Sequence, residues 1–322
     1  MRLEQIGFYT LNDARAKNAS ATSPMQRCEI LITDRCNFKC PYCRGFSAFM
    51  PKGDASCESV TSALDNWIAD GLVNVRFSGG EPTTHPNLSQ FVSYCKSNGV
   101  ERIAVSTNGS RPNAMYRDLI ELGVNDFSIS LDACCADFGN KMAGVAGKWE
   151  RVIGNIRRLS ERVYVTVGIV VTEETADTIV DVIRFAHDLG VADIRIISAA
   201  QYNQKLWNLD RVPTQILDAH PILAYRVEHF LSGRNVRGIV STDCHKCHLV
   251  KDDSMIVGVY HYPCVIYARE GGIPIGRVSS TMREERTRWF DRHNSYADPI
   301  CRKNCLDVCI DYNNRVRELN RG

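Results

Sequence analysis

The chain has 322 residues, of which 44% are hydrophobic and 24% charged, and its formal net charge is +2. This composition is typical of a globular protein and excludes a disordered or fibrous chain. It contains no run of about 18 apolar residues, so we expect no membrane-spanning helix. The near-neutral charge argues against strong, salt-dependent electrostatic binding of nucleic acid.

Short β-branched runs alternate with longer stretches of helical periodicity along most of the chain. We expect strands at 28–33, 73–78, 102–107, 126–131, 162–172 and 193–199, and helices at 57–71, 86–98, 112–122, 148–161, 173–189 and within 213–232. Glycine closes several of these helices, as it often does. Six β/α units predict a parallel sheet with helices outside it. They favour a partial (β/α)6 TIM-like barrel, and a doubly wound sheet is the alternative.

The ends of the first four expected strands carry polar and glycine-rich sequence. The first strand runs into a group of cysteines at Cys36, and the second runs into Gly79-Gly80-Glu81-Pro82. The third ends in Thr107-Asn108-Gly109 and the fourth in Ser130-Leu131-Asp132. Connecting loops are polar in general, but barrels of this kind gather their chemistry at these strand ends. We therefore expect a ligand site on this face.

The chain has 14 cysteines, a high number for its length. The sequence begins MRLEQIGFYT, which lacks the basic and apolar segments of a secretory signal, so we expect a cytoplasmic protein with reduced thiols. Clustered cysteines in such a protein indicate metal sites more often than disulfides. The scattered cysteines, at positions 28, 57, 95, 134 and 135, are expected to be small buried apolar side chains.

Cys36, Cys40 and Cys43 form a C-x3-C-x2-C cluster directly after the first strand. Three thiolates on one short loop can bind three irons of a [4Fe–4S] cube. The fourth iron is then left open, as a catalytic metal requires. The loop contains no histidine to complete a tetrahedral zinc site, which disfavours zinc.

Residues 28–200 resemble the radical S-adenosylmethionine (radical SAM) superfamily. The three cysteines match its C-x3-C-x2-C motif, with Tyr42 at its usual aromatic position, and Gly79-Gly80-Glu81-Pro82 matches its GGE motif. Thr107-Asn108-Gly109 and Ser130-Leu131-Asp132 match its strand-end motifs.

The resemblance implies a set of roles for these residues. S-adenosylmethionine (SAM) would chelate the open iron, and Gly79 and Gly80 would let the backbone approach its amino group. Asn108 and Ser130 would contact its ribose or carboxylate. Glu81 could instead fix its own loop. Tyr42, Thr107 and Asp132 complete the expected cofactor-binding set, and the family's chemistry is hydrogen abstraction by a 5′-deoxyadenosyl radical.

Ala133-Cys134-Cys135 stands where many relatives have glycine after the fourth strand end. Cys134 could return a hydrogen atom to a substrate radical, which makes it a candidate catalytic residue. A buried packing thiol is the more ordinary interpretation.

Six further cysteines gather near the C-terminus, at Cys244, Cys247, Cys264, Cys301, Cys305 and Cys309. Their segment has little apolar periodicity, so we expect a small domain that folds around a metal. The pattern resembles the SPASM or Twitch auxiliary-cluster domains of the superfamily. It holds too few cysteines for two complete cubes, so we expect one auxiliary [4Fe–4S] cluster.

The choice of auxiliary ligands depends on the shape of the last segment. On a straight helix Cys301 and Cys309 would lie ~12 Å apart, too far to share a cube. Either one of the last three cysteines is spare, or the segment is not a regular helix. We expect Cys247 and Cys264 with two of the last three, and Cys244 in reserve.

Two other interpretations of these cysteines stay open. Cys244, Cys247 and Cys264 could hold three irons and leave a site for substrate. A zinc ribbon that uses His245, His248 or His261 is the structural alternative.

We therefore expect an N-terminal extension at 1–27, a radical SAM partial barrel at 28–232 and an auxiliary-cluster domain at 233–322. The expected activity is reductive SAM cleavage with hydrogen abstraction from a small molecule, such as a sugar, nucleoside or amino-acid derivative. The 27 residues before the first strand are too few for a peptide-binding domain. An electron donor such as flavodoxin or ferredoxin is the expected partner.

Three alternatives to this activity stay open. A peptide could be the substrate, delivered by a separate partner, or a nucleobase could be modified. The third is a non-enzymatic iron–sulfur redox protein, against which the GGE loop argues.

Overall fold

The computed structural model describes residues 13–43, 52–198 and 208–320. The chain divides into two compact units. The first comprises Met1–Arg35, Gly45–Ile103 and Arg237–Gly322, and the second Cys36–Arg44 and Ala104–Val236. The first unit therefore combines early segments of the chain with its C-terminal segment, which lie far apart in the sequence.

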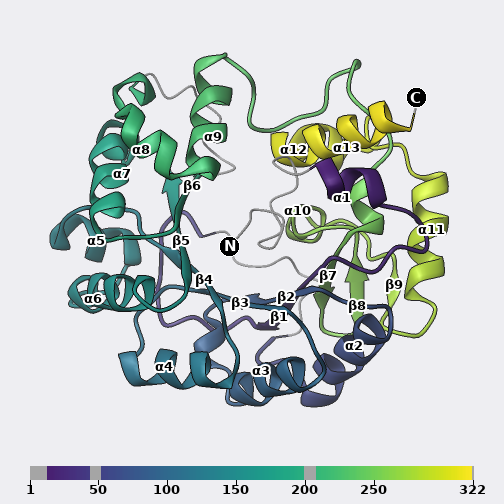
Figure 1. Cartoon of the computed structure of the whole chain (residues 1–322), viewed down its shortest axis with the longest axis horizontal. Coiled ribbons are helices and arrows are strands. Elements are labelled where there is room, and N and C mark those ends of the chain that lie inside the picture. Colours follow the sequence, from purple (N-terminus) through teal and green to yellow (C-terminus); the bar gives the residue numbers. More distant parts are fainter. Residues whose placement is uncertain (1–12, 44–51, 199–207, 321–322) are drawn as a thin grey trace. The chain divides into compact units, whose positions relative to one another are not determined.

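Five strands of the first unit lie side by side in the order β2-β1-β7-β8-β9. They are β1 (Arg27–Thr33), β2 (Asn74–Gly79), β7 (Asp253–Val257), β8 (Tyr260–Tyr262) and β9 (Gly276–Arg277). β1 runs parallel to both β2 and β7, whereas β8 and β9 pair antiparallel. Helices α2 (Cys57–Ala69) and α3 (Leu88–Ser97) lie outside β1 and β2 (Figure 1).

Burial explains why these segments form strands and helices. Cys28 and the residues after it in β1 are all buried, as expected of a parallel strand covered on both faces. Helix α2 begins at Ser56, whose side chain accepts from the Ser59 N–H, and its buried face includes Leu64 and Trp67. This packing fixes the end of β1 from which the first cysteine loop departs.

The second unit has parallel strands in the order β3-β4-β5-β6. They are β3 (Arg102–Thr107), whose first two residues belong to the first unit, β4 (Asp126–Ser130), β5 (Tyr164–Val171) and β6 (Asp193–Ser198). Its helices are α4 (Asn113–Leu122), α5 (Ala136–Ala143), α6 (Trp149–Ser160), α7 (Ile179–Asp188), α8 (Thr214–Ala219) and α9 (Pro221–Leu231). Short 3₁₀ turns over the two units are η3 (Pro82–Thr84), η4 (Ala176–Thr178), η5 (Leu209–Arg211) and η6 (His248–Lys251).

The expected fold class is confirmed, because six β/α units with parallel strands form an open, partial (β/α)6 barrel. Four details differ from the sequence-based expectation. Residues 136–143 form α5, between the expected strand at 126–131 and the expected helix at 148–161, where no helix was expected. The expected helix at 173–189 begins with η4, and that within 213–232 is broken before Pro221, whose ring cannot continue a helix. Strands β7–β9 were not expected.

The C-terminal segment of the first unit surrounds the later cysteines. It contains α10 (Val265–Arg269), α11 (Met282–Arg292), α12 (Pro299–Asn304) and α13 (Asp307–Leu319). α1 (Asp13–Asn18) packs against α13 (Figure 1). The buried Arg286 of α11 donates to the carbonyls of Val250 at 2.8 Å and Tyr262 at 2.9 Å. These bonds hold η6 and β8, which carry Cys247 and Cys264 at their ends.

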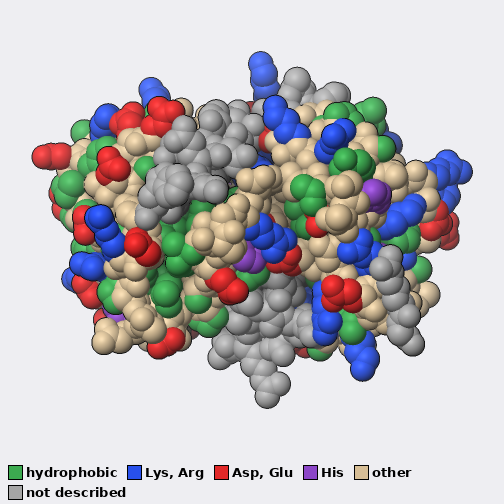
Figure 2. All heavy atoms as spheres, turned by 90° about the horizontal axis from the view of Figure 1, so that it is seen from above, with side chains coloured by type: hydrophobic (Ala, Val, Ile, Leu, Met, Phe, Trp, Pro, Cys, Tyr) green, Lys and Arg blue, Asp and Glu red, His purple; other side chains and the backbone are tan. Residues whose placement is uncertain are grey.

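No helix in the described part of the chain has the length and hydropathy that a membrane crossing needs. On the face in Figure 2, acidic and basic side chains are interspersed among the described residues. This mixed surface agrees with the near-neutral net charge of +2.

Candidate metal centres

The loop at Cys36–Cys43 belongs to the second unit and carries the first three cysteines. Cys36 and Cys43 are exposed and Cys40 is half-buried. The Phe38 N–H donates to the Cys36 sulfur at 3.4 Å, and the Cys43 N–H donates to the Cys40 carbonyl at 3.0 Å. Two of the three cysteines of this loop are therefore open to solvent and the third is partly covered.

Tyr42 anchors this loop to the end of β4. Its hydroxyl donates a short hydrogen bond to Asp132, which also accepts from the Val170 N–H at 2.8 Å. Burial raises the pKa of Asp132 to about 6, although both hydrogen bonds oppose this. Burial likewise raises the pKa of Cys40 to about 11, so this thiol must release a proton to bind a metal.

Asn108 holds the first half of the same loop to the end of β3. Its side-chain amide donates to Asn37 at 2.8 Å, and Asn37 in turn donates to the Ser110 hydroxyl at 2.8 Å. The Ser110 N–H closes the ring of contacts by donating to Asn108 at 3.1 Å. Within the second unit, Asn108, Asp132 and the cysteine loop are thus brought together.

The Gly79-Gly80-Glu81 turn belongs to the first unit and is shaped by the residues that precede Cys36. A Cβ on Gly79 would lie 2.2 Å from the Thr33 carbonyl oxygen, and one on Gly80 would lie 2.2 Å from that of Arg35. Gly79 also has φ +144°, which L side chains rarely adopt. The space that these glycines leave is therefore filled by the chain's own backbone.

Glu81 fixes this turn. Its carboxylate is buried and accepts from the Thr83 N–H at 3.1 Å and from the Thr83 hydroxyl at 2.6 Å. The Glu81 N–H donates to the Arg35 carbonyl at 2.7 Å. The turn thus holds Arg35, the last residue of the first unit before the cysteine loop.

Three other predicted residues have separate surroundings in the second unit. Ser130 is exposed at the end of β4. The Thr107 hydroxyl shares a hydrogen bond with Tyr116 at 3.2 Å and accepts from Gly109. Cys134 is half-buried, and burial, with Cys135 nearby, raises its pKa.

Five of the six later cysteines come together in the first unit. Their thiols are near enough to influence one another electrostatically: Cys309 and Cys247 raise the pKa of Cys264, and Cys247 and Cys264 raise the pKa of Cys301. Cys305 forms a hydrogen bond with Cys309. All five are half-buried, and none is in a disulfide. Sequence reasoning had named this set but could not choose within it.

A break in the last helical segment allows this meeting. α12 ends at Asn304, Cys305 caps it in an extended conformation with ψ 131°, and α13 begins at Asp307. Cys301 and Cys309 therefore lie on two different helices. The spacing left two possibilities, namely that one of these cysteines is spare or that the segment is not a regular helix. The structure shows the second.

The donor set fits an iron–sulfur cluster. Burial, and to a lesser extent the neighbouring Cys309, raises the pKa of Cys247 to about 12, and the pKa of Cys264 is also raised by burial. The Cys264 sulfur accepts from the Tyr267 N–H at 3.4 Å, the kind of contact that stabilises a metal-bound thiolate. Thiols gathered this way suit soft metal ligation.

Cys244 and the histidines of the zinc alternative are engaged elsewhere. The Cys244 sulfur points to the Lys246 carbonyl at 3.4 Å. His245 contacts the Ser241 carbonyl, the ring of His248 lies against Phe290, and His261 is bonded to Glu285. None of these contacts is with a thiol, which weakens the zinc-ribbon interpretation.

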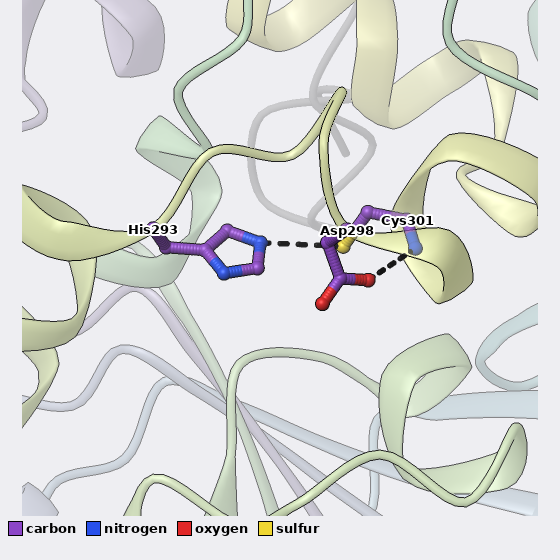
Figure 3. A group of neighbouring side chains, drawn as sticks. All are labelled: His293, Asp298 and Cys301. Atoms are coloured by element: carbon purple, nitrogen blue, oxygen red, sulfur yellow. Dashed lines mark hydrogen bonds between the residues drawn. The ribbon is translucent and has the colours of Figure 1, made fainter.

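His293 is a residue that sequence reasoning missed. Its Nε2 lies 3.6 Å from the Cys301 sulfur (Figure 3). Its ligand atom, one of Asp298 and the sulfur of Cys301 all lie within 4.8 Å of one another. The spacing of eight residues between His293 and Cys301 matches no metal signature, so only the fold reveals the contact.

Residues 30–186 match the family model described as the Radical SAM superfamily. GTP 3′,8-cyclase of Rhodopseudomonas palustris is 29% identical over 170 residues, which cover 50% of this chain and 49% of that protein. Molybdenum cofactor biosynthesis protein 1 of Drosophila melanogaster is 28% identical over 190 residues, 57% of this chain and 33% of that one. The chain spans about half the length of the cyclase, and less of the fly protein.

Solved structures resemble the chain over more of its length. SuiB of Streptococcus suis bound to S-adenosylmethionine matches with a TM-score of 0.59 at 14% identity, over 84% of this chain and 64% of that one. Native anSMEcpe with bound AdoMet matches with a TM-score of 0.58 at 15% identity, over 92% and 95%. At these identities the likeness shows the fold.

Proposed function

Because the chain belongs to the radical SAM superfamily, we propose that it cleaves SAM reductively and abstracts a hydrogen atom from a small-molecule substrate. The family binds a [4Fe–4S] cluster and SAM. The observation that carries the proposal is the loop of Cys36, Cys40 and Cys43, in which two cysteines are exposed and a hydrogen bond from Tyr42 to Asp132 anchors the loop.

The chain's own residues would hold and shape this centre. Cys36, Cys40 and Cys43 would supply three sulfur ligands and leave one position for SAM. When bound, the cluster supplies the electron that breaks a carbon–sulfur bond of SAM. Asn108 would steady the start of the loop through Asn37. Gly79, Gly80 and Glu81 would set the entry into the loop, and Ser130, Thr107 and Asp132 would line or support the cofactor site.

We propose one auxiliary [4Fe–4S] cluster, held by Cys247 and Cys264 with two of Cys301, Cys305 and Cys309. The mutual proximity of these five thiols supports it. Five thiols for four corners favour a cluster ligated entirely by protein. Such a cluster suits electron transfer more than substrate anchoring. The segment 233–322 would be the auxiliary-cluster domain, after an extension at 1–27 and a barrel at 28–232.

For the substrate we favour a nucleoside or nucleotide. The support is that the curated relatives include several proteins named GTP 3′,8-cyclase, which match about half of this chain. A sugar or amino-acid derivative fits the same chemistry. A peptide is the second candidate, because a neighbour in fold, SuiB, was solved bound to its precursor peptide SuiA. The reducing electron would come from a flavodoxin or ferredoxin.

The activity is tested by anaerobic reconstitution followed by incubation with SAM and dithionite. We expect 5′-deoxyadenosine from the wild type and none from the triple variant C36A/C40A/C43A. Cys135→Ala is the matched control, since Cys135 is an exposed thiol of the same unit outside the loop. A fully loaded wild type that yields no 5′-deoxyadenosine would overturn the enzyme proposal in favour of a redox carrier.

The substrate class is tested with deuterated ribonucleosides and nucleotides. Deuterium in the 5′-deoxyadenosine identifies the molecule from which hydrogen was taken. We expect transfer from a nucleoside or nucleotide. Transfer only from a peptide would move the assignment to peptide modification.

A further inference from the structure

His293 lies directly after α11 and contacts Cys301 of α12 through space. The Nε2–Sγ distance is 3.6 Å, and Figure 3 shows the imidazole edge pointing toward the cysteine. This length is that of a hydrogen bond between a ring nitrogen and a sulfur, and the Nε2–H tautomer of His293 makes the imidazole its donor.

Two aromatic rings and a backbone bond fix the imidazole in this direction. Trp289 stacks on His293 with ring centroids 3.8 Å apart and planes 18° apart. Tyr267 meets the same ring edge-on at 6.2 Å and 86°. The His293 N–H donates to the Trp289 carbonyl at 2.9 Å. These contacts hold the imidazole in this orientation without a bound ligand.

Cys301 is fixed independently of His293. One oxygen of Asp298 accepts from the Cys301 N–H at 2.8 Å, and the other accepts from the Tyr267 hydroxyl at 3.1 Å. Tyr267 thus touches His293 by its ring and Asp298 by its hydroxyl. Both halves of the His293–Cys301 contact are set by one small network.

A mononuclear metal ion held by His293, Asp298 and Cys301 explains the geometry less well. Donors around a tetrahedral zinc lie no more than ~4 Å apart, and these three atoms lie within 4.8 Å of one another. Both oxygens of Asp298 already accept hydrogen bonds. The carboxylate therefore acts as a helix cap, and the remaining pair is a histidine facing a thiol.

We propose that His293 donates its Nε2–H to the sulfur of Cys301 as a ligand of the auxiliary cluster, and that this bond raises the reduction potential of that cluster. The inference rests on the function proposed above and selects Cys301 as one of the two undecided ligands. Its thiol faces Cys247 and Cys264, the two ligands already assigned. Reduction adds negative charge to the cluster sulfurs, and a hydrogen-bond donor stabilises that charge.

The test is a potentiometric titration followed by electron paramagnetic resonance. It uses the full chain with C36A/C40A/C43A, so that only the auxiliary cluster, about four irons, contributes to the signal. In His293→Phe, which keeps the stacking, we expect the ratio of reduced to oxidised cluster at a fixed potential to fall about tenfold, or 59 mV for a one-electron couple. His293→Gln retains a side-chain N–H donor, so its ratio of reduced to oxidised cluster should lie between those of the parent protein and of His293→Phe.

His245→Phe is the matched control. His245 stacks on Tyr296 at 4.7 Å in the same unit, and its Nε2 bonds to the Ser241 carbonyl. We expect its potential to equal that of the parent protein. If His293→Phe binds fewer than four irons, the reduction potential of His293→Gln, compared with that of the parent protein, decides the question.

Three results would overturn the inference. One is an unchanged potential in both His293 variants with iron intact, and another is an auxiliary cluster that survives Cys301→Ala. The third is zinc that disappears with His293. Failure of the proposed function is a separate observation, because it appears as missing 5′-deoxyadenosine in the wild type and leaves these potentials unaffected.

Discussion

The two groups of cysteines are assembled in opposite ways. The first three lie on one loop, Cys36–Cys43, with two of them exposed. The later five span Cys247–Cys309, are half-buried and come from the ends and interiors of separate elements. The first group is local in sequence, and residues outside the loop hold it: Asp132 accepts a hydrogen bond from Tyr42, and Asn108 donates one to Asn37.

This difference separates two roles for a metal. A loop that is held by hydrogen bonds before it binds a cluster can leave a coordination position open to a ligand. Thiols that converge from distant elements tie those elements together when metal binds, so cluster binding and folding become coupled. We therefore expect loss of the second cluster to affect stability most, and changes near the first to affect chemistry most.

The largest effect is expected from Cys264→Ala, which removes the thiol that faces Cys247, Cys301 and Cys309. Iron should fall from ~8 to ~4 per chain, with a destabilisation of about 4 kcal/mol or more. Hydrogen exchange should rise across 237–320 and stay unchanged at 104–196. Retention of all eight irons would break the contrast between the groups.

Gly80→Ala should damage the first centre without disturbing the second. A Cβ there meets the Arg35 carbonyl at 2.2 Å, so we expect a cost of about 1–3 kcal/mol and a SAM-cleavage rate at least tenfold lower. Gly154→Ala in α6 is the control, because its nearest atom lies at 3.4 Å and alanine favours helices. Equal SAM-cleavage rates in the two variants would contradict the inference that the turn containing Gly80 shapes the first centre.

Asp132→Asn should change how stability depends on pH. Burial raises the native pKa of Asp132 to about 6, above the unfolded value of ~3.9. The native state thus binds the extra proton, and stability from this group is present below pH ~4 and lost as the pH rises toward 6. Melting of the metal-free protein should show a shallower fall over this window in the variant. Parallel curves would argue against a buried carboxyl there.

Cys244→Ser should have the smallest effect. Its sulfur contacts only the Lys246 carbonyl among the partners found for it. We expect unchanged iron content, an unchanged auxiliary spectrum and a stability change within about 1 kcal/mol. Loss of four irons would restore the ligand trio of Cys244, Cys247 and Cys264 and open a position for substrate.

Strong local signals made most of the barrel predictable. Strand β3 lies at the expected 102–107, and Gly71, Gly99 and Gly190 follow helices with positive φ of 86°, 79° and 79°. Strands β8 and β9, of three and two residues, are too short for a periodic signal, whereas β7 was missed although β4, of the same five residues, was expected. The pairing of β7 with β1 joins positions more than 220 residues apart, and local pattern cannot reveal it.

The two candidate sites differ in the same way in how far the sequence alone predicts them. C-x3-C-x2-C is a compact motif, so Cys36, Cys40 and Cys43 were located directly. The bond from Tyr42 to Asp132 spans 90 residues and the grouping of Cys247 with Cys309 spans a whole segment. Tertiary packing creates these contacts, and so it also creates the one between His293 and Cys301.

The extended residue between α12 and α13 limits how this centre could be rebuilt elsewhere. A designer who copied 301–309 as one continuous helix into a new scaffold would spread its outer sulfurs over ~12 Å. Only a template that includes the corner at Cys305 keeps Cys301 and Cys309 on two separate helices, as they are here. The transferable unit is thus a bent pair of helices, and a deletion that straightened the corner would disable it while leaving every ligand in place.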